Sequence, residues 1–202
     1  MSKKLIAFIT TVVVMLAVAS PATAQRINVK TNALYWLAMS PNLGVEFRIN
    51  RHMTFNLEGV VNRVSGFKPY GVSNLSTKGF AFEPEARYWF CNKFMGHFIG
   101  IHAHGGQFNM GGLDLDFKFL GTNYRNLRDH RYEGWFAGGG IAYGYAWTLG
   151  RHWNMEAELG IGYSYSGYDK YPCEKCGKKV ESDGNHHYYG ITKAALSLVY
   201  VF

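Results

Sequence analysis

After its first 24 residues, the sequence lacks any apolar run approaching the roughly 18 to 20 residues that a membrane-spanning helix needs. Any crossing of a membrane would therefore have to be made by strands. Cysteine is also scarce, with three residues in the chain, of which Cys173 and Cys176 form a single C-x-x-C pair. One such pair is half of a zinc ribbon, so the sequence does not carry that motif.

The amino terminus has the pattern of a secretory leader. Lys3 and Lys4 precede an uncharged apolar run that reaches about Ala19, and an A-x-A site ends at Ala24. This pattern predicts a signal peptide over residues 1–24 and a single domain over residues 25–202. The formal net charge of +7 falls to +5 without the two leader lysines. Secretion argues against nucleic acid as the partner of this charge and favours acidic lipopolysaccharide, or solvated loop charges that have no specific partner.

Bulky apolar side chains alternate with small or polar ones in eight segments of the mature chain. In the last segment, Leu196, Leu198 and Tyr200 share a face with Phe202, whereas Lys193 and Ser197 lie on the other face. A period of two residues is typical of β-strands. The segments are residues 27–37, 42–49, 53–62, 79–90, 96–109, 133–149, 153–166 and 188–202. Pro84 lies within the fourth segment and predicts a bulge or local bend there.

The polarity of the two faces separates a membrane barrel from a soluble one. The face without bulky side chains carries charges, glycines and alanines, which suits a narrow and crowded lumen. The other face carries aromatic residues near the segment ends, as interfacial girdles require. These are Tyr35, Tyr88, Phe90, Trp135, Trp147, Trp153, Tyr163, Tyr165 and Tyr200. A soluble lipocalin-like barrel in the periplasm stays an alternative, but its interior should be apolar.

The connections between segments also fit a bacterial barrel. Residues 50–52, 91–95 and 150–152 are short, whereas residues 63–78, 110–132 and 167–187 are long. Outer-membrane barrels have short periplasmic turns and longer external loops. The end of the chain, with Tyr200 and Phe202, resembles the signal that bacterial barrel-assembly machinery reads. We therefore predict an all-β fold, an eight-stranded antiparallel transmembrane β-barrel of up-and-down topology in the bacterial outer membrane.

Charged residues and histidines gather on the face that is predicted to line the lumen. They are Lys30, Glu46, Arg48, Glu58, Glu83, Glu85, Arg87, His102, His104, Glu156, Glu158 and Lys193. An eight-stranded barrel is just wide enough for side chains to fill it, which favours a plug of salt bridges and hydrogen bonds. A path for ions or protons through the same groups is the alternative. His102 and His104 could ligate a metal together with a glutamate, but His-x-His is a weak signal, and we predict no cofactor.

Two further groups of residues could carry chemistry. Ser164 or Ser166 could form a triad with a lumen histidine and a glutamate, as in an enzyme that modifies lipid A, although a filled lumen leaves little room for a lipid.

In the last long loop, secretion favours a disulfide between Cys173 and Cys176. Free or redox-active thiols, or a metal bound with His186 and His187, are alternatives.

Several stretches resemble the bacterial family called domain of unknown function 3575. They are Lys30-Thr31-Asn32, Pro41-Asn42-Leu43-Gly44, Pro84-Glu85-Ala86-Arg87-Tyr88-Trp89, Gly96-His97-Phe98-Ile99-Gly100, Arg131-Tyr132-Glu133-Gly134-Trp135 and Tyr168-Asp169-Lys170-Tyr171-Pro172-Cys173. The resemblance covers nearly the whole mature chain. It implies a small outer-membrane barrel-like protein with no established activity, whose relatives accompany fimbria-related surface proteins. It supplies no catalytic residues.

Together these observations predict a structural or surface-interaction role that depends on the external loops. The expected partners are outer-membrane lipid, lipopolysaccharide, the barrel-assembly machinery and surface or fimbrial proteins. The alternatives are an enzyme that modifies lipid A and a narrow conductor of ions or protons.

Overall fold

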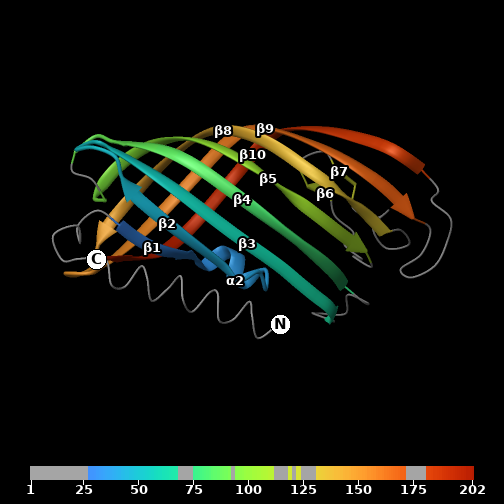
Figure 1. The fold of residues 1–202 in the computed structure, drawn as a ribbon, viewed down its shortest axis with the longest axis horizontal. Coiled ribbons are helices and arrows are strands. Elements are labelled where there is room, and N and C mark those ends of the chain that lie inside the picture. Colours follow the sequence, from blue (N-terminus) through green and yellow to red (C-terminus); the bar gives the residue numbers. More distant parts are fainter. Residues whose placement is uncertain are drawn as a thin grey trace.

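The structure is a computed structural model that describes residues 27–67, 75–91, 94–111, 118–119, 122–123, 131–171 and 181–202. Within these residues, eight antiparallel strands form one closed barrel, in the order β1-β10-β9-β8-β5-β4-β3-β2 (Figure 1). Each strand pairs with its neighbour in this order, and β1 closes the sheet by pairing with both β2 and β10. The predicted leader, residues 1–24, lies outside the described residues.

The barrel strands differ widely in length. They are β1 (Ile27–Asn32), β2 (Asn42–Arg48), β3 (Met53–Phe67), β4 (Leu75–Trp89), β5 (Gly96–Gly111), β8 (Arg131–Thr148), β9 (Trp153–Tyr171) and β10 (Glu181–Val201). A short helix, α2 (Ala33–Leu37), joins β1 to β2, and β6 (Lys118–Phe119) pairs separately with β7 (Thr122–Asn123). No helix in the described part of the chain is long and apolar enough to cross a membrane.

The eight predicted segments match the eight barrel strands, but several strands extend farther than the alternation of side chains indicated. For example, β3 continues to Phe67 because pairs such as Arg63 with Lys78 extend its ladder with β4. Backbone hydrogen bonds hold these ends together where the side chains no longer alternate between apolar and polar. The long connections are therefore shorter than predicted, and the barrel extends beyond the predicted segments on that side.

The first predicted segment is wrong beyond Asn32, where the chain turns into α2 instead of continuing as a strand. The Asn32 side chain accepts a hydrogen bond from the backbone N–H of Leu34 at 3.0 Å and so caps the helix. The backbone N–H of Asn32 in turn donates to Oδ1 of Asn42 at 2.6 Å. As a result Tyr35 does not belong to the outer aromatic girdle, because it lines a cavity inside the barrel.

Pro84 does not introduce the predicted bulge. Leu57 faces Pro84 in the ladder between β3 and β4, and the β4–β5 pairs on either side, Phe82 with Gly105 and Glu85 with His102, keep one register. The missing N–H of proline is therefore accommodated without an inserted residue. In the described residues, register shifts occur instead near Phe67 in β3 and near Gly184 and Lys193 in β10.

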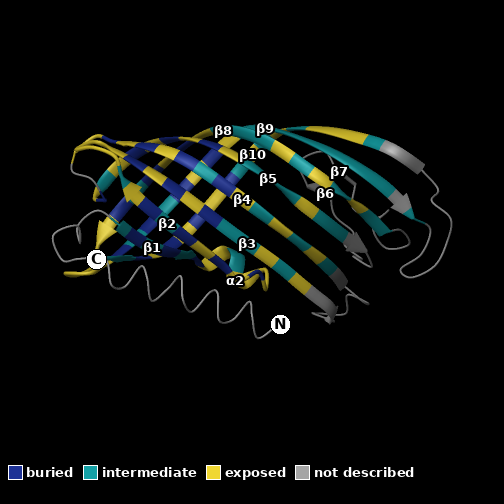
Figure 2. Ribbon diagram, viewed as in Figure 1, coloured by how far each residue is buried: buried dark blue, intermediate teal, exposed yellow. Residues whose placement is uncertain are grey.

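The two faces of the barrel wall have opposite polarity, as the alternation predicted. Exposed and buried residues alternate along each strand, most clearly at the end with the short turns (Figure 2). Large apolar side chains stand on the outside, including Leu57, Phe82, Ile101, Ile141, Leu159 and Ile161. The buried side chains are mainly polar or charged. A soluble barrel has the reverse arrangement, with its apolar side chains inside.

Candidate functional site in the barrel interior

Three buried cations form the centre of the barrel interior. Lys30 from β1 extends its ammonium to Oε2 of Glu46 on β2 at 2.6 Å and to Oε2 of Glu156 on β9 at 2.9 Å. Lys193 from β10 reaches Oε1 of Glu83 at 2.6 Å and Oε2 of Glu85 at 2.8 Å. Each lysine therefore joins strands that lie far apart in the sequence across the lumen.

Arg87 on β4 connects the two lysine clusters. Its Nε donates to Oε2 of Glu85 at 2.7 Å, and its Nη2 donates to Oε2 of Glu158 at 2.7 Å. Its Nη1 donates to Oε2 of Glu156 at 3.0 Å, the same oxygen that Lys30 contacts. The guanidinium also lies 4.6 Å from the centre of the Phe98 ring. The planar fork of arginine is suited to several carboxylates at once, so Arg87 is the hub of the network.

Aromatic side chains close the lumen at the end with the short turns. The Trp89 indole donates from Nε1 to Oγ1 of Thr54 at 2.9 Å, and its ring centre lies 4.6 Å from that of Phe98. Phe94 packs against Trp89 from the turn between β4 and β5. We did not predict this aromatic floor. Trp89 shares the strand face of Glu85 and Arg87, so the period of two contained the signal for its inward position.

Glycines in the wall give the network its space. A Cβ atom at Gly100 would overlap a carboxylate oxygen of Glu85, and one at Gly144 would overlap the Phe98 ring. Larger residues at these positions would have to displace the buried side chains. The small residues of the inner face therefore allow long charged and aromatic side chains to fill a narrow barrel.

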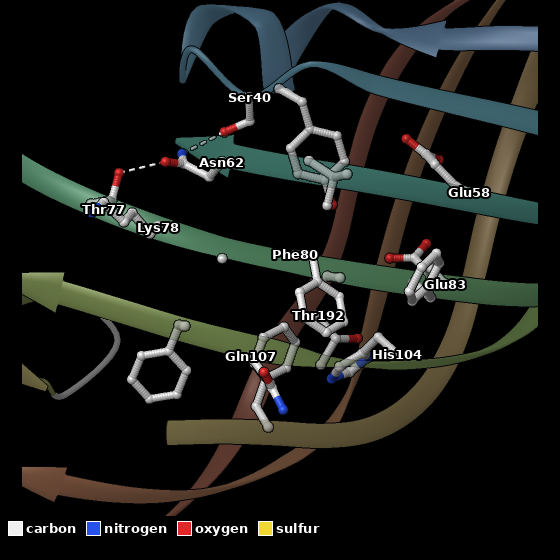
Figure 3. Close-up of a pocket in the computed structure, with 17 residues that line it drawn as sticks. Ser40, Glu58, Asn62, Thr77, Lys78, Phe80, Glu83, His104, Gln107 and Thr192 are labelled. Carbon is white, nitrogen blue, oxygen red and sulfur yellow. Dashed lines mark hydrogen bonds between the residues drawn. The ribbon is translucent and has the colours of Figure 1, made fainter. Parts of the chain in front are cut away.

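Beyond the network lies a cavity of about 300 Å³ (Figure 3). Its polar lining includes Ser40, Asn62 and Thr77, which are linked because Asn62 donates to Ser40 and Thr77 donates to Asn62. Its apolar lining includes Val60, Ala81, Phe108 and Phe136. Glu58 and Glu83 also line it, so the cavity joins the charged network on one side. We did not predict this cavity.

The barrel wall is incomplete beside the cavity. Because β1 and β2 are short, the β1–β10 ladder ends at the pair Asn32 and Ser197, and the β2–β3 ladder ends at Asn42 and Val60. In the described residues no strand pairs with the facing edges of β3 and β10 beyond these points. Residues from both edges, Asn62 and Thr192, line the cavity.

The histidines lie at the border between the network and the cavity. The Nε2 atom of His102 lies 2.9 Å from Oγ1 of Thr192, and the rings of His102 and His104 are stacked 5.9 Å apart. Among the described residues no group of three or more histidines, cysteines, aspartates or glutamates is arranged to hold a metal ion. Nor does a hydrogen bond join Ser164 or Ser166 to either histidine, although all four residues are described, so the structure does not assemble the triad.

Arg48 and the loop residues lie apart from the network. Arg48 was predicted to line the lumen, but it stands at the end of β2 and donates to the backbone oxygen of Asn50 at 3.1 Å. It shares the inward face with Thr54, its partner in the β2–β3 ladder, but it lies at the rim, where its half-buried side chain reaches the turn. His186 is exposed, and Nδ1 of His187 lies 2.7 Å from the Tyr163 hydroxyl.

Two other predicted sites concern the cysteines and the end of the chain. Cys173 and Cys176 fall outside the described residues, whereas Cys91 is an exposed free thiol in the turn after β4. Tyr200 stacks edge-on against Phe202, with ring centres 5.0 Å apart, and the backbone N–H of Phe202 donates to Ile27. The last residues are thus held against the first strand of the barrel.

A comparison with protein families matches residues 8–202 to the family described as "Protein of unknown function (DUF3575)". The chain belongs to the DUF3575 family. The match spans nearly the whole chain and confirms the resemblance that the sequence carried. A search among curated proteins found no match. Membership of DUF3575 brings no known activity, and the interior described above offers no assembled catalytic group in the described residues.

Proposed function

We propose that this DUF3575 protein is a transmembrane β-barrel of the bacterial outer membrane that acts as a structural or surface-interaction protein and not as an enzyme. One observation carries the proposal, namely the polarity of the wall. Many outward side chains of the described strands are large and apolar, whereas Lys30, Arg87, Lys193 and their glutamates are buried inside. Lipid against one face and polar groups in the lumen is the arrangement that a transmembrane barrel requires.

The spacing of outward aromatic side chains along the barrel agrees with the thickness of a membrane. Trp135 and Trp147 both point outward from β8 and lie twelve residues apart. At roughly 3.3 Å per residue and a tilt of about 40°, their separation along the barrel axis is about 30 Å. This agrees with an apolar band of about 25 Å that is flanked by aromatic girdles. Tyr165 packs beside Trp135, and Tyr145 packs beside Trp147.

The orientation follows from the position of the turns. The three short turns and Phe202 lie at the same end of the barrel (Figure 1, left). In bacterial barrels this end faces the periplasm, so residues 68–74, 112–130 and 172–180 would belong to the external connections. A cleaved leader over residues 1–24 and recognition of Tyr200 and Phe202 by the barrel-assembly machinery are part of the proposal. Lipopolysaccharide and surface or fimbrial proteins are the proposed partners of the external loops.

The packed charged network argues against a conductor, and the hydrogen bonds of the interior argue against an enzyme. A channel for ions or protons needs a continuous polar path through the lumen. Here the ion pairs around Arg87 occupy the lumen, and the rings of Trp89 and Phe98 occupy it next to them. An enzyme that modifies lipid A needs a nucleophile hydrogen-bonded to a base, and among the described residues no hydrogen bond joins Ser164 or Ser166 to His102 or His104. We therefore expect no single-channel conductance in planar bilayers and unchanged lipid A in cells that lack the protein.

Cell fractionation with gel electrophoresis tests the location and the barrel together. We expect the protein in the outer membrane, with a gel mobility that shifts on boiling, because folded barrels withstand detergent at low temperature. Protease added to intact cells should cut within residues 172–180. A soluble periplasmic protein without the mobility shift would contradict the proposal.

A further inference from the structure

The carboxylates inside the barrel outnumber the cations. The buried cations of the described residues are Lys30, Arg87 and Lys193, and the buried carboxylates are Glu46, Glu58, Glu83, Glu85, Glu156 and Glu158. With the histidines neutral, the difference of three minus six leaves a formal charge of −3. Buried charge without a partner is costly, so the interior favours either protons or an additional cation.

Glu58 is the carboxylate without a cation. Its side chain is 5% exposed, its Oε1 has no hydrogen-bond partner, and it forms no ion pair with any described residue. Glu58 faces Glu83 directly in the β3–β4 ladder, so their Cβ atoms lie roughly 5 Å apart on the same face. Lys193 compensates Glu83 at 2.6 Å, and it is also held by Glu85 and Glu158.

The cavity continues from Glu58 along a mainly apolar lining, to which Lys78 and Gln107 also contribute. Glu58 and Glu83 lie on one side of the cavity in Figure 3, and Val60, Phe108 and Phe136 form part of the remaining lining. The volume of about 300 Å³ is at the lower end of the range of small-molecule sites. The gap in strand pairing between β3 and β10 lies beside the cavity, and α2, whose Tyr35 lines the cavity, packs against β10.

We propose that this cavity binds a small amphiphilic amine, whose ammonium group pairs with Glu58 and whose apolar part packs against Val60, Phe108 and Phe136. A carboxylate beside an apolar cavity selects a ligand that has both a positive charge and an apolar body. The ammonium would supply the missing cation to Glu58 and a hydrogen bond to its unpaired oxygen. This binding site goes beyond the structural role proposed above and does not depend on it.

Isothermal titration of the full mature protein in detergent, with 2-phenylethylammonium as the probe, tests the proposal. The uncharged analogue 2-phenylethanol has the same ring and a similar length. We expect the protein to prefer the amine by about tenfold or more, because hydrogen bonds to charged groups are the stronger ones. The same titration into protein-free micelles corrects for partition into detergent. The test works in detergent solution and is therefore independent of where the protein resides in the cell.

Glu58→Gln should remove this preference, lowering the affinity for the amine about tenfold and leaving that for the alcohol unchanged. Glu133→Gln is the matched control, because Glu133 is exposed on β8 and does not line the cavity. Ala81→Phe should weaken binding of both probes by filling the cavity. A gel shift on boiling verifies that each variant is folded. Equal affinity for amine and alcohol, an unchanged Glu58→Gln variant, or binding of Mg²⁺ or Ca²⁺ in place of the amine would overturn the proposal.

Discussion

Replacing Arg87 by methionine removes the hub of the interior network and leaves its volume nearly filled. Arg87 donates to carboxylates at 2.7 Å, 2.7 Å, 3.0 Å and 3.3 Å, and its side chain is 2% exposed. Breaking a buried ion pair by removing one partner costs about 3 to 5 kcal/mol, because the other charge stays buried without compensation. Protonation of the abandoned glutamates limits the loss. We therefore expect the free energy of unfolding to fall by about 3 to 5 kcal/mol.

Urea unfolding of the protein folded into lipid vesicles measures this loss, and tryptophan fluorescence reports the transition. Arg48→Met is the matched control, because Arg48 lies at a strand end outside the network. A surface substitution of this kind should change the stability by no more than about 0.5 kcal/mol. Adding Glu158→Gln to Arg87→Met should restore about 0.5 to 3 kcal/mol, because it removes one of the carboxylates that Arg87 compensated. A loss below about 1 kcal/mol for Arg87→Met would show that the ion pairs of the network are not tightly coupled.

Two further substitutions test the wall of the barrel, with the same unfolding measurement. Gly100→Ala should destabilise the protein by about 1 to 3 kcal/mol, because the new Cβ overlaps Glu85. Gly150→Ala should have little effect, because the space around Gly150 is open. Equal effects of the two substitutions would show that the interior side chains rearrange freely. Leu159→Arg should lower the free energy of unfolding by about 2 to 4 kcal/mol if β9 faces lipid at this residue. Ile49→Arg, at the end of the barrel with the short turns, should lower it by about 1 kcal/mol or less. Similar small costs at both positions would contradict a lipid-facing wall.

The inward positions could be predicted because they follow a local rule. Glu85 and Arg87, like Glu156 and Glu158, lie two residues apart, and two is the period at which side chains of a strand return to one face. All four are buried, as the alternation indicated. Arg48 also follows this rule, since it pairs with the buried Thr54. A period carries no information about where a strand ends, however, and at the end of β2 the Arg48 side chain reaches the turn instead of the network.

The remaining features depend on contacts between distant parts of the chain. The helix α2 needs the contact between Asn32 and Asn42, and it carries Tyr35 from the predicted outer face into the interior. The choice of Glu156 as a partner of Lys30 depends on the closure of the barrel, since 126 residues separate the two. The cavity arises from the shortness of β1 and β2 relative to β3 and β10. The local alternation of apolar and polar side chains does not predict any of these contacts.

Cysteine scanning along β9 distinguishes a barrel wall that faces lipid from one that faces water. In a variant without Cys91, Cys173 and Cys176, single cysteines at residues 154–161 would carry a fluorophore, and the protein would be folded into vesicles that contain a lipid-borne quencher. We expect strong quenching at residues 155, 157, 159 and 161 and weak quenching at residues 154, 156, 158 and 160. Uniformly weak quenching, or quenching without a period of two, would contradict a barrel that faces lipid with its apolar side.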